Sequence, residues 1–127
     1  MDRNPSPGFK RNPGHTITVR PYQGTVTVGF AGAVIATSDR AQLLQEANYP
    51  PVLYMPFADI RFDALTPSDT STHCPYKGDA SYWSAGAGGE TCRDVMWAYQ
   101  DPYDEMLAIK DNGAFYPDRV DIRTSGA

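Results

Sequence analysis

Prolines and glycines occur along the whole chain and constrain its fold more than any other feature of the sequence. There are eleven of each among 127 residues, and they are spread out rather than clustered. Both residue types interrupt regular structure and mark turns. Their spacing leaves room for short elements joined by many turns, which favours β structure over a helical bundle. We therefore expect a mainly β protein.

The length and composition are those of one folded domain. At 127 residues, with 41% hydrophobic residues, the chain can bury a core without a metal or disulfide scaffold. Residues 1–14 contain three prolines and two glycines but almost no apolar side chains, so burial cannot offset their ordering entropy. The sequence predicts a flexible arm over residues 1–14 and a single β-rich domain over residues 15–127.

The charge balance argues against partners that need a basic surface. The chain has 11 basic and 15 acidic residues, a net charge of −4, so no basic face is available to neutralise nucleic-acid phosphates. No apolar run approaches the roughly 20 residues that span a bilayer, and the N-terminal residues lack a signal-peptide core. We expect a cytoplasmic protein with no nucleic-acid or membrane partner, whose Cys74 and Cys92 are free thiols.

Two segments have the pattern of β-hairpins. In each, apolar and polar residues alternate on both sides of a turn that contains proline and glycine. The predicted hairpins are residues 15–20 and 25–30 around 21–24, and residues 70–74 and 80–84 around 75–78.

Further short elements follow from local composition. Strands are predicted at residues 33–36, 52–55, 60–65, 95–99, 114–116 and 119–123, whereas residues 39–47 are compatible with helix or strand and favour a strand. The clearest helix signal comes late in the chain. Asp101 can cap a helix, Pro102 suits its first position and Gly113 can end it. We expect one short helix there.

Several motifs occur in the order found in one protein family. They include Phe30-Ala31-Gly32, His73-Cys74-Pro75-Tyr76-Lys77-Gly78, Trp97-Ala98-Tyr99 and Ala114-Phe115-Tyr116-Pro117. In these, the chain resembles the family described as domain of unknown function 427, which is widespread in bacteria and also found in fungi. The resemblance covers nearly all of residues 17–120.

The resemblance implies a strongly curled antiparallel β-sheet of the β-tent type, with the late helix as its main helical piece. It implies no activity. A nucleotidyltransferase label is attached to the family, but the residues do not support it, because there is no paired Asp-x-Asp metal motif and no glycine-rich phosphate loop.

Two basic residues are candidates for holding an anion. Lys77 lies on the turn of the second predicted hairpin, where its ammonium group could hold a phosphate or carboxylate as a point charge. A solvated turn lysine is an equally good interpretation. An unpaired Arg40 in a pocket would bind an anion bidentately, but structural pairing with a carboxylate is favoured.

Aromatic residues on several predicted strands can line one concave pocket of a curled sheet. The alternative is a core with polar tips at its edge, and we expect most of the rings in the core and two or three at a cavity. The candidates are Tyr54, Tyr82, Trp97, Tyr99 and Tyr116. We assign Tyr22, Trp83 and Tyr103 to the surface or rim.

Cys74 follows His73, and a nearby imidazolium would activate a thiol. Neighbours on a strand point to opposite faces, so a half-buried structural cysteine is favoured over a catalytic one. His15, His73, Cys74 and Cys92 lack the spacing of zinc ligands. The sequence therefore predicts neither a metal nor a cofactor.

The leading hypothesis is a domain that binds a small anionic ligand in an aromatic-lined cavity. One alternative is an enzyme that acts on a small metabolite through Cys74 or through a Lys77 and Tyr82 acid–base pair. Another is a protein-interaction module that forms a homodimer through exposed aromatic residues.

Overall fold

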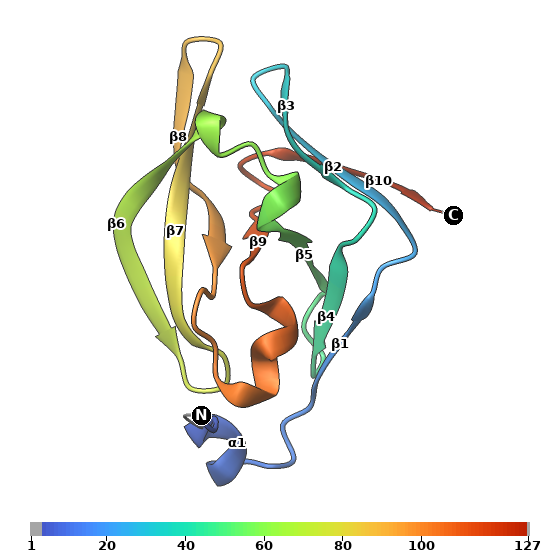
Figure 1. Ribbon diagram of the computed structural model, residues 1–127, viewed down its shortest axis with the longest axis vertical. Helices are drawn as coiled ribbons and strands as arrows, with labels where there is room; N and C mark the ends of the chain where they lie inside the picture. Colours follow the sequence, from blue (N-terminus) through green and yellow to red (C-terminus); the bar gives the residue numbers. More distant parts are fainter. Residues whose placement is uncertain (1–3, 127) are drawn as a thin grey trace.

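One strongly curled antiparallel sheet dominates the computed structural model, which describes residues 4–126 (Figure 1). Its seven strands follow the order β1-β4-β5-β9-β8-β7-β6. The prediction of a mainly β protein built on a curled antiparallel sheet is confirmed. The strands are β1 (Ile17–Pro21), β4 (Gln42–Glu46), β5 (Val52–Pro56), β6 (Leu65–Cys74), β7 (Gly78–Ala87), β8 (Glu90–Ala98) and β9 (Asn112–Phe115).

A smaller sheet and four short helices complete the fold. The small sheet has the order β10-β2-β3, with β2 (Gly24–Phe30), β3 (Ala33–Ser38) and β10 (Asp121–Gly126). The helices are α1 (Pro7–Arg11) and the 3-10 helices η1 (Phe57–Asp59), η2 (Phe62–Ala64) and η3 (Asp104–Ile109). None of the helices within residues 4–126 is long and apolar enough to cross a membrane.

The large sheet has a hydrophobic cluster on each face. The first core lies between the two sheets and joins Val28 and Ile35 of the small sheet to Met96 of β8. The second core lies on the other face, where Tyr54 and Tyr99 pack with residues of β4, β7 and η3. Because both faces are covered, alternate residues along the central strands are buried in different cores.

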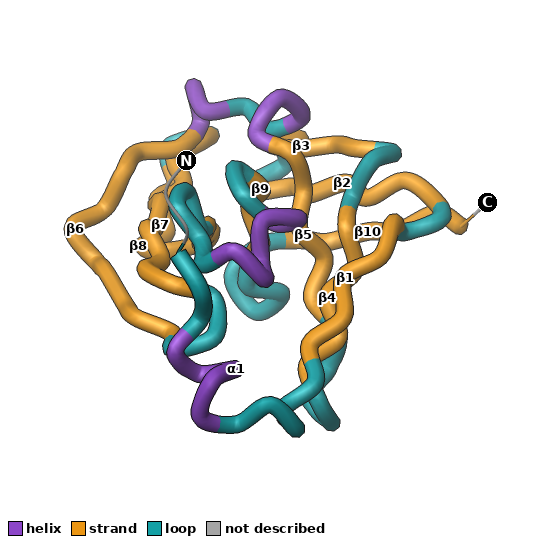
Figure 2. Tube along the Cα trace, turned by 60° about the horizontal axis from the view of Figure 1, so that its bottom comes forward, coloured by secondary structure: helices purple, strands orange, loops and turns teal. Residues whose placement is uncertain are grey.

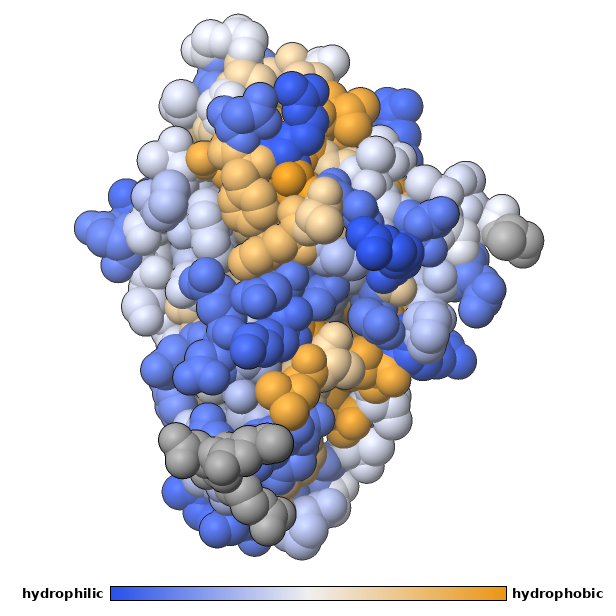
Figure 3. Space-filling view, in the orientation of Figure 1, coloured by the Kyte–Doolittle hydropathy of each residue, from blue (hydrophilic) through white to orange (hydrophobic). Residues whose placement is uncertain are grey.

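This double coverage corrects the placement of Trp83. We expected it at the surface or rim, but it is only 7% exposed and belongs to the first core. Phe57 and Phe62 pack edge-on against its ring, with centroids 5.8 Å and 6.0 Å away. Figure 3 shows hydrophobic residues gathered over η1 and η2, the helices that carry these two phenylalanines.

The first predicted hairpin is wrong, whereas the second is confirmed. β1 pairs with β4, and β2 pairs with β3, so residues 21–24 form a corner that passes the chain from one sheet to the other. Proline and glycine favour both a corner and a chain reversal, so the sequence alone does not tell these two structures apart. β6 and β7 pair around the predicted turn, with Cys74 opposite Gly78.

Two other elements differ from expectation, and one ambiguity is settled. Residues 39–47 contain β4, so the strand interpretation is confirmed. Residues 60–65 contain η2 where a strand was expected, and only Leu65 belongs to a strand, as the first residue of β6. The late helix is the 3-10 helix η3, and Gly113, expected to end it, lies in β9. Met106 and Ile109 of η3 are both buried in the second core, and the backbone kinks at Met106.

Residues 4–14 differ from the predicted flexible arm, whose residues 1–3 lie outside the described part. Ser6 is fully buried, and its hydroxyl donates to the Pro75 carbonyl at 2.9 Å. The Gly8 amide donates to the same oxygen, also at 2.9 Å. Phe9 packs against the second core, so tertiary contacts supply the burial that the composition lacks. Figure 2 shows α1 and the following chain passing from the β6–β7 side to the β1–β4 side.

The turn between β2 and β3 contains a strained residue. Ala31 and Gly32 have φ angles of 52° and 81°, the pattern of a two-residue turn that favours Asn-Gly. We expect Ala31→Asn to raise the free energy of unfolding by about 0.5–1 kcal/mol, measured by urea denaturation. Ala33→Asn, in the adjoining strand, is the matched control and should lower it. A loss of stability in Ala31→Asn would contradict this account of the turn.

Candidate functional site

Three of the predicted site residues form a series of contacting rings that runs outward from the second core. Tyr54 is 2% exposed, and its hydroxyl accepts a hydrogen bond from Trp97 Nε1 at 3.2 Å. The Trp97 ring lies 4.5 Å from the Tyr116 ring, centroid to centroid. The guanidinium of Arg119 lies over the Tyr116 ring, 4.5 Å from the ring centroid. The series therefore ends at a positive charge.

The two other candidate tyrosines share this face of the large sheet. Tyr82 is opposite Trp97 in the β7–β8 pairing, and its hydroxyl lies 2.8 Å from the Thr72 hydroxyl. Tyr99 is 7% exposed in the second core. The structure thus brings the five predicted aromatics together, mostly as packed rings.

Burial raises the pKa of several of these phenols. It raises the pKa of Tyr54 and of Tyr99 far above the ordinary value of a tyrosine. Burial, together with the neighbouring Tyr82, raises the pKa of Tyr116 to about 12. At neutral pH these side chains therefore present neutral hydroxyl groups.

Arg119 was not among the residues predicted from the sequence; it is exposed, but two contacts orient its guanidinium. Its amide donates to the Tyr116 carbonyl at 3.0 Å, which closes a turn and returns the side chain over the Tyr116 ring. Its Nη1 donates to the Asp94 carbonyl at 2.7 Å. Among residues 4–126, no carboxylate forms an ion pair with it. The Pro117-Asp118 pair, a turn signal, was the only available clue.

Irregular strand pairing holds the Asp94 carbonyl in place. The β6–β7 and β7–β8 ladders both shift register near Trp83. Asp94 has a φ of 53°, and its amide donates to the Ser84 hydroxyl at 3.1 Å. Its carboxylate accepts a hydrogen bond from the Thr70 hydroxyl at 2.7 Å. Such bulges re-aim groups next to functional sites.

The Asp94 carboxylate is ionised within this network. Burial opposes its ionisation, but hydrogen bonds from Ser68 and Thr70 and the charges of Arg93 and Arg119 keep its pKa below the ordinary value. Its Oδ1 is buried and has no hydrogen-bond partner among the described residues.

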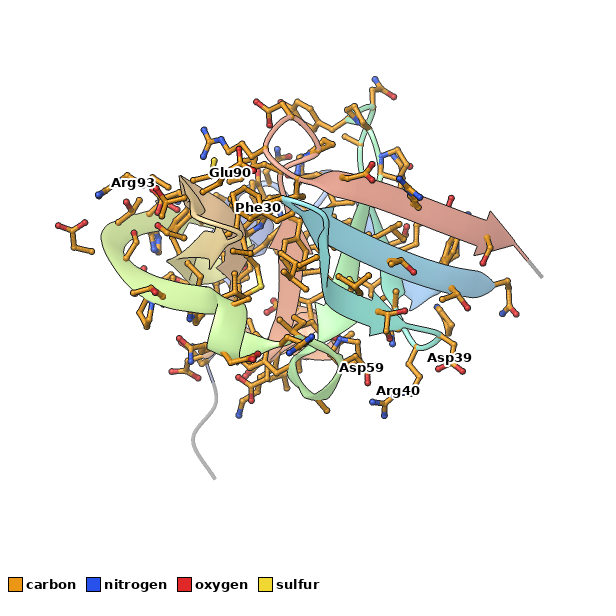
Figure 4. All side chains as sticks on the ribbon, turned by 90° about the horizontal axis from the view of Figure 1, so that it is seen from above. Phe30, Asp39, Arg40, Asp59, Glu90 and Arg93 are labelled. Carbon is orange, nitrogen blue, oxygen red and sulfur yellow. The ribbon has the colours of Figure 1, made fainter. Side chains whose placement is uncertain are left out.

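Arg119 also lines a hollow of about 400 Å³. The other lining residues are Gly29, Phe30, Ala31, Glu90, Asp118, Val120 and Asp121. A second hollow of about 230 Å³ shares Gly29, Phe30, Ala31 and Asp121 with it and extends to Arg123. Figure 4 shows Phe30 and Glu90 close together at this end of the molecule.

Lys77, the first candidate from the sequence, already has an anionic partner. Its Nζ lies 2.6 Å from Glu46 Oε1, and His15 Nε2 lies 2.8 Å from Glu46 Oε2. Burial tends to raise the pKa of Glu46, but hydrogen bonds from Lys77 and His15 outweigh it and hold the pKa below its ordinary value. Lys77 precedes β7 and Glu90 follows it, so this ion pair and the hollow lie at opposite ends of that strand.

Arg40 also has a carboxylate partner and lies apart from Arg119. Its Nη2 is 3.0 Å from Asp59 Oδ1, and its side chain is 61% exposed. Ser38 donates to the other Asp59 oxygen at 2.6 Å, and these contacts keep the pKa of Asp59 below its ordinary value. Figure 4 shows Arg40 beside Asp59, away from Phe30 and Glu90. The structural pairing is the better interpretation of Arg40.

Cys74 and His73 point away from each other. Cys74 packs against the second core, whereas His73 is 54% exposed and its Nδ1 lies 2.7 Å from Asp79 Oδ1. The geometry does not favour a cysteine–histidine pair. Both cysteines are free thiols. Within residues 4–126, no group of three His, Cys, Asp or Glu side chains is placed to hold a metal ion.

Comparison with known proteins identifies a family. No curated protein matches the chain. A family model matches residues 18–126, which include every strand except the first residue of β1. The resemblance seen in the motifs is therefore confirmed. The chain belongs to the family described as Domain of unknown function (DUF427).

Proposed function

We propose that the protein binds a small molecule through an anionic group held by Arg119. The observation that carries this proposal is a guanidinium fixed from two sides, by the Tyr116 ring and the Asp94 carbonyl, without a carboxylate partner in the described chain. A guanidinium that is already oriented loses little conformational entropy when a ligand arrives. Its remaining N–H groups suit a carboxylate or phosphate.

Within residues 4–126, several other cations are already engaged by carboxylates, unlike Arg119. Each of the following forms an ion pair with a carboxylate: Arg40, Arg61, Lys77, Arg93 and Arg123. The anion-binding role that the sequence suggested for Lys77 and Arg40 is therefore better assigned to Arg119. The Tyr116 ring packs against the guanidinium of Arg119. The uncharged part of the ligand lies in the hollow, against Phe30 and Val120.

The enzymatic alternatives gain no support from the geometry. Lys77 is engaged by Glu46, and Tyr82 is engaged by Thr72, so they do not form an acid–base pair with each other. The interaction module, including a homodimer, stays a prediction.

Calorimetric titration of benzoate and phenyl phosphate at low ionic strength tests the proposal. We expect Arg119→Gln to weaken binding of both anions at least about 10-fold, because a charged hydrogen bond contributes about 1.5–3 kcal/mol. Arg119→Lys should retain part of the affinity, since an ammonium keeps the charge but not the planar donor pair.

The matched control is Arg20→Gln in β1, which removes an exposed arginine that forms no ion pair within residues 4–126. It should leave binding unchanged. Equal affinity in wild-type protein and Arg119→Gln would refute the proposal, as would an equal loss in Arg20→Gln, which would indicate non-specific charge attraction. Circular dichroism of both variants verifies that they fold.

A further inference from the structure

The geometry points to a zwitterionic ligand, a small molecule with a positively charged amine as well as its anionic group. This inference rests on the proposed function, because it takes Arg119 as the anion site. Two acidic residues, Glu90 and Asp118, line the same hollow as Arg119. Neither forms an ion pair within residues 4–126. The hollow thus presents free charges of both signs.

The free charges come from segments far apart in the sequence. Glu90 begins β8, whereas Asp118 and Arg119 lie between β9 and β10. The β2–β3 turn meets the β7–β8 turn here, since a Cβ at Gly88 would lie 3.4 Å from the Ala31 carbonyl. Folding therefore assembles a mixed-charge rim around one hollow.

The charge balance of the rim disfavours a ligand that is only anionic. Arg119 contributes one positive charge, while Glu90 and Asp118 contribute two negative charges. Asp121 also lines the hollow, but Arg123 Nε lies 2.9 Å from its carboxylate and compensates it. One negative charge is left over. An ammonium group on the ligand would satisfy it, so a ligand that is only anionic would bind Arg119 less tightly than a zwitterion.

The uncharged residues that line the hollow indicate what lies between the two charged groups of the ligand. Phe30 and Val120 supply apolar surface, and Gly29 adds no side chain. Ala31 leaves space as well, although its turn favours asparagine, whose amide would extend beyond the methyl group of alanine. An α-amino acid with an apolar side chain has the matching chemistry: a carboxylate, an ammonium and an apolar group.

The test compares three matched probes by calorimetry on the whole protein. They are phenylalanine, 3-phenylpropanoate, which lacks the ammonium, and phenethylamine, which lacks the carboxylate. We expect wild-type protein to bind phenylalanine at least about 10-fold more tightly than either analogue, which corresponds to about 1.4 kcal/mol. In the Glu90→Gln/Asp118→Asn variant, phenylalanine should weaken and 3-phenylpropanoate should strengthen, so that the preference disappears. Asp39→Asn, an acidic residue outside this hollow, is the control and should keep it.

The possible failures can be told apart. If 3-phenylpropanoate binds as tightly as phenylalanine and requires Arg119, the zwitterion inference is wrong and the proposed function stands. If none of the acids depends on Arg119, both are wrong. If phenethylamine binds most tightly and Arg119→Gln strengthens it, the hollow is a cation site, which also overturns both.

Discussion

Replacing Glu46 with alanine is expected to lower the free energy of unfolding by about 2–3 kcal/mol, even though the residue lies outside the proposed ligand site. Its carboxylate accepts from Lys77 at 2.6 Å and lies 2.8 Å from the His15 ring nitrogen. The Lys77 side chain is only 10% exposed, so without Glu46 its ammonium remains poorly solvated and unpaired. The Glu46 side chain is 19% exposed, which places the expected cost below that of a fully buried pair.

A second substitution separates the ion pair from simple loss of packing. Adding Lys77→Met to Glu46→Ala removes the stranded ammonium, so the double variant should regain part of the lost stability. Urea denaturation of the wild type, both single variants and the double variant gives the interaction energy. If the two losses simply add, the pair does not have the role described.

The same carboxylate gives a defined pH dependence. Because the folded protein holds the pKa of Glu46 below its ordinary value of 4.5, its contribution to stability is fully present above that pH. The contribution is lost as the pH falls through the lower pKa of the folded state. Glu46→Gln cannot ionise and should lack this part of the acid-induced loss.

Trp83→Ala should cost about 3–5 kcal/mol of stability, the largest effect expected of any substitution proposed for this chain. The side chain is 7% exposed and packs edge-on against Phe57 and Phe62, which also contact each other. Removing it leaves a cavity that the sheet backbone cannot close. Far-UV circular dichroism should follow the denaturation, because the substitution removes one of only two tryptophans.

A matched aromatic truncation provides the comparison. Tyr49 is 65% exposed, and Tyr49→Ala should change stability by no more than about 0.5 kcal/mol. A cost below about 1 kcal/mol for Trp83→Ala would mean that the first core does not depend on this ring.

Local sequence signals predicted some pairings well and missed others for a physical reason. The turn before Gly78 was predicted correctly because Gly78, with a φ of 119°, adopts a conformation that side-chain-bearing residues avoid. The Ala31-Gly32 turn was missed because alanine is not a residue expected at a positive φ. Pairing of β1 with β4 joins residues 21 to 29 positions apart, and no local pattern encodes it.

In the candidate site too, the sequence predicted some features and missed others. The sequence predicted that aromatic residues on several strands could line one pocket, and the strand register sets Tyr82 opposite Trp97. Whether a charge is free, however, depends on which distant carboxylate reaches it. Lys77 meets Glu46, 31 positions earlier, whereas Arg119 meets a backbone carbonyl. A single sequence does not reveal either contact.

The seam between β5 and β9 has a consequence for how the chain is made. Met55 pairs with Gly113 and Pro56 with Asn112, and these are the two register pairs that join the halves of the large sheet. Proline supplies no amide donor, so Pro56 cannot donate a hydrogen bond across this junction, and the next bond comes from the Phe57 amide to the Asp111 carbonyl at 3.0 Å. While the protein emerges from the ribosome, the edge of β5 that pairs with β9 remains unpaired until β9 has been synthesised. Completion of the sheet is therefore expected to be a late event in biosynthesis, slowed by closure of the long intervening loop.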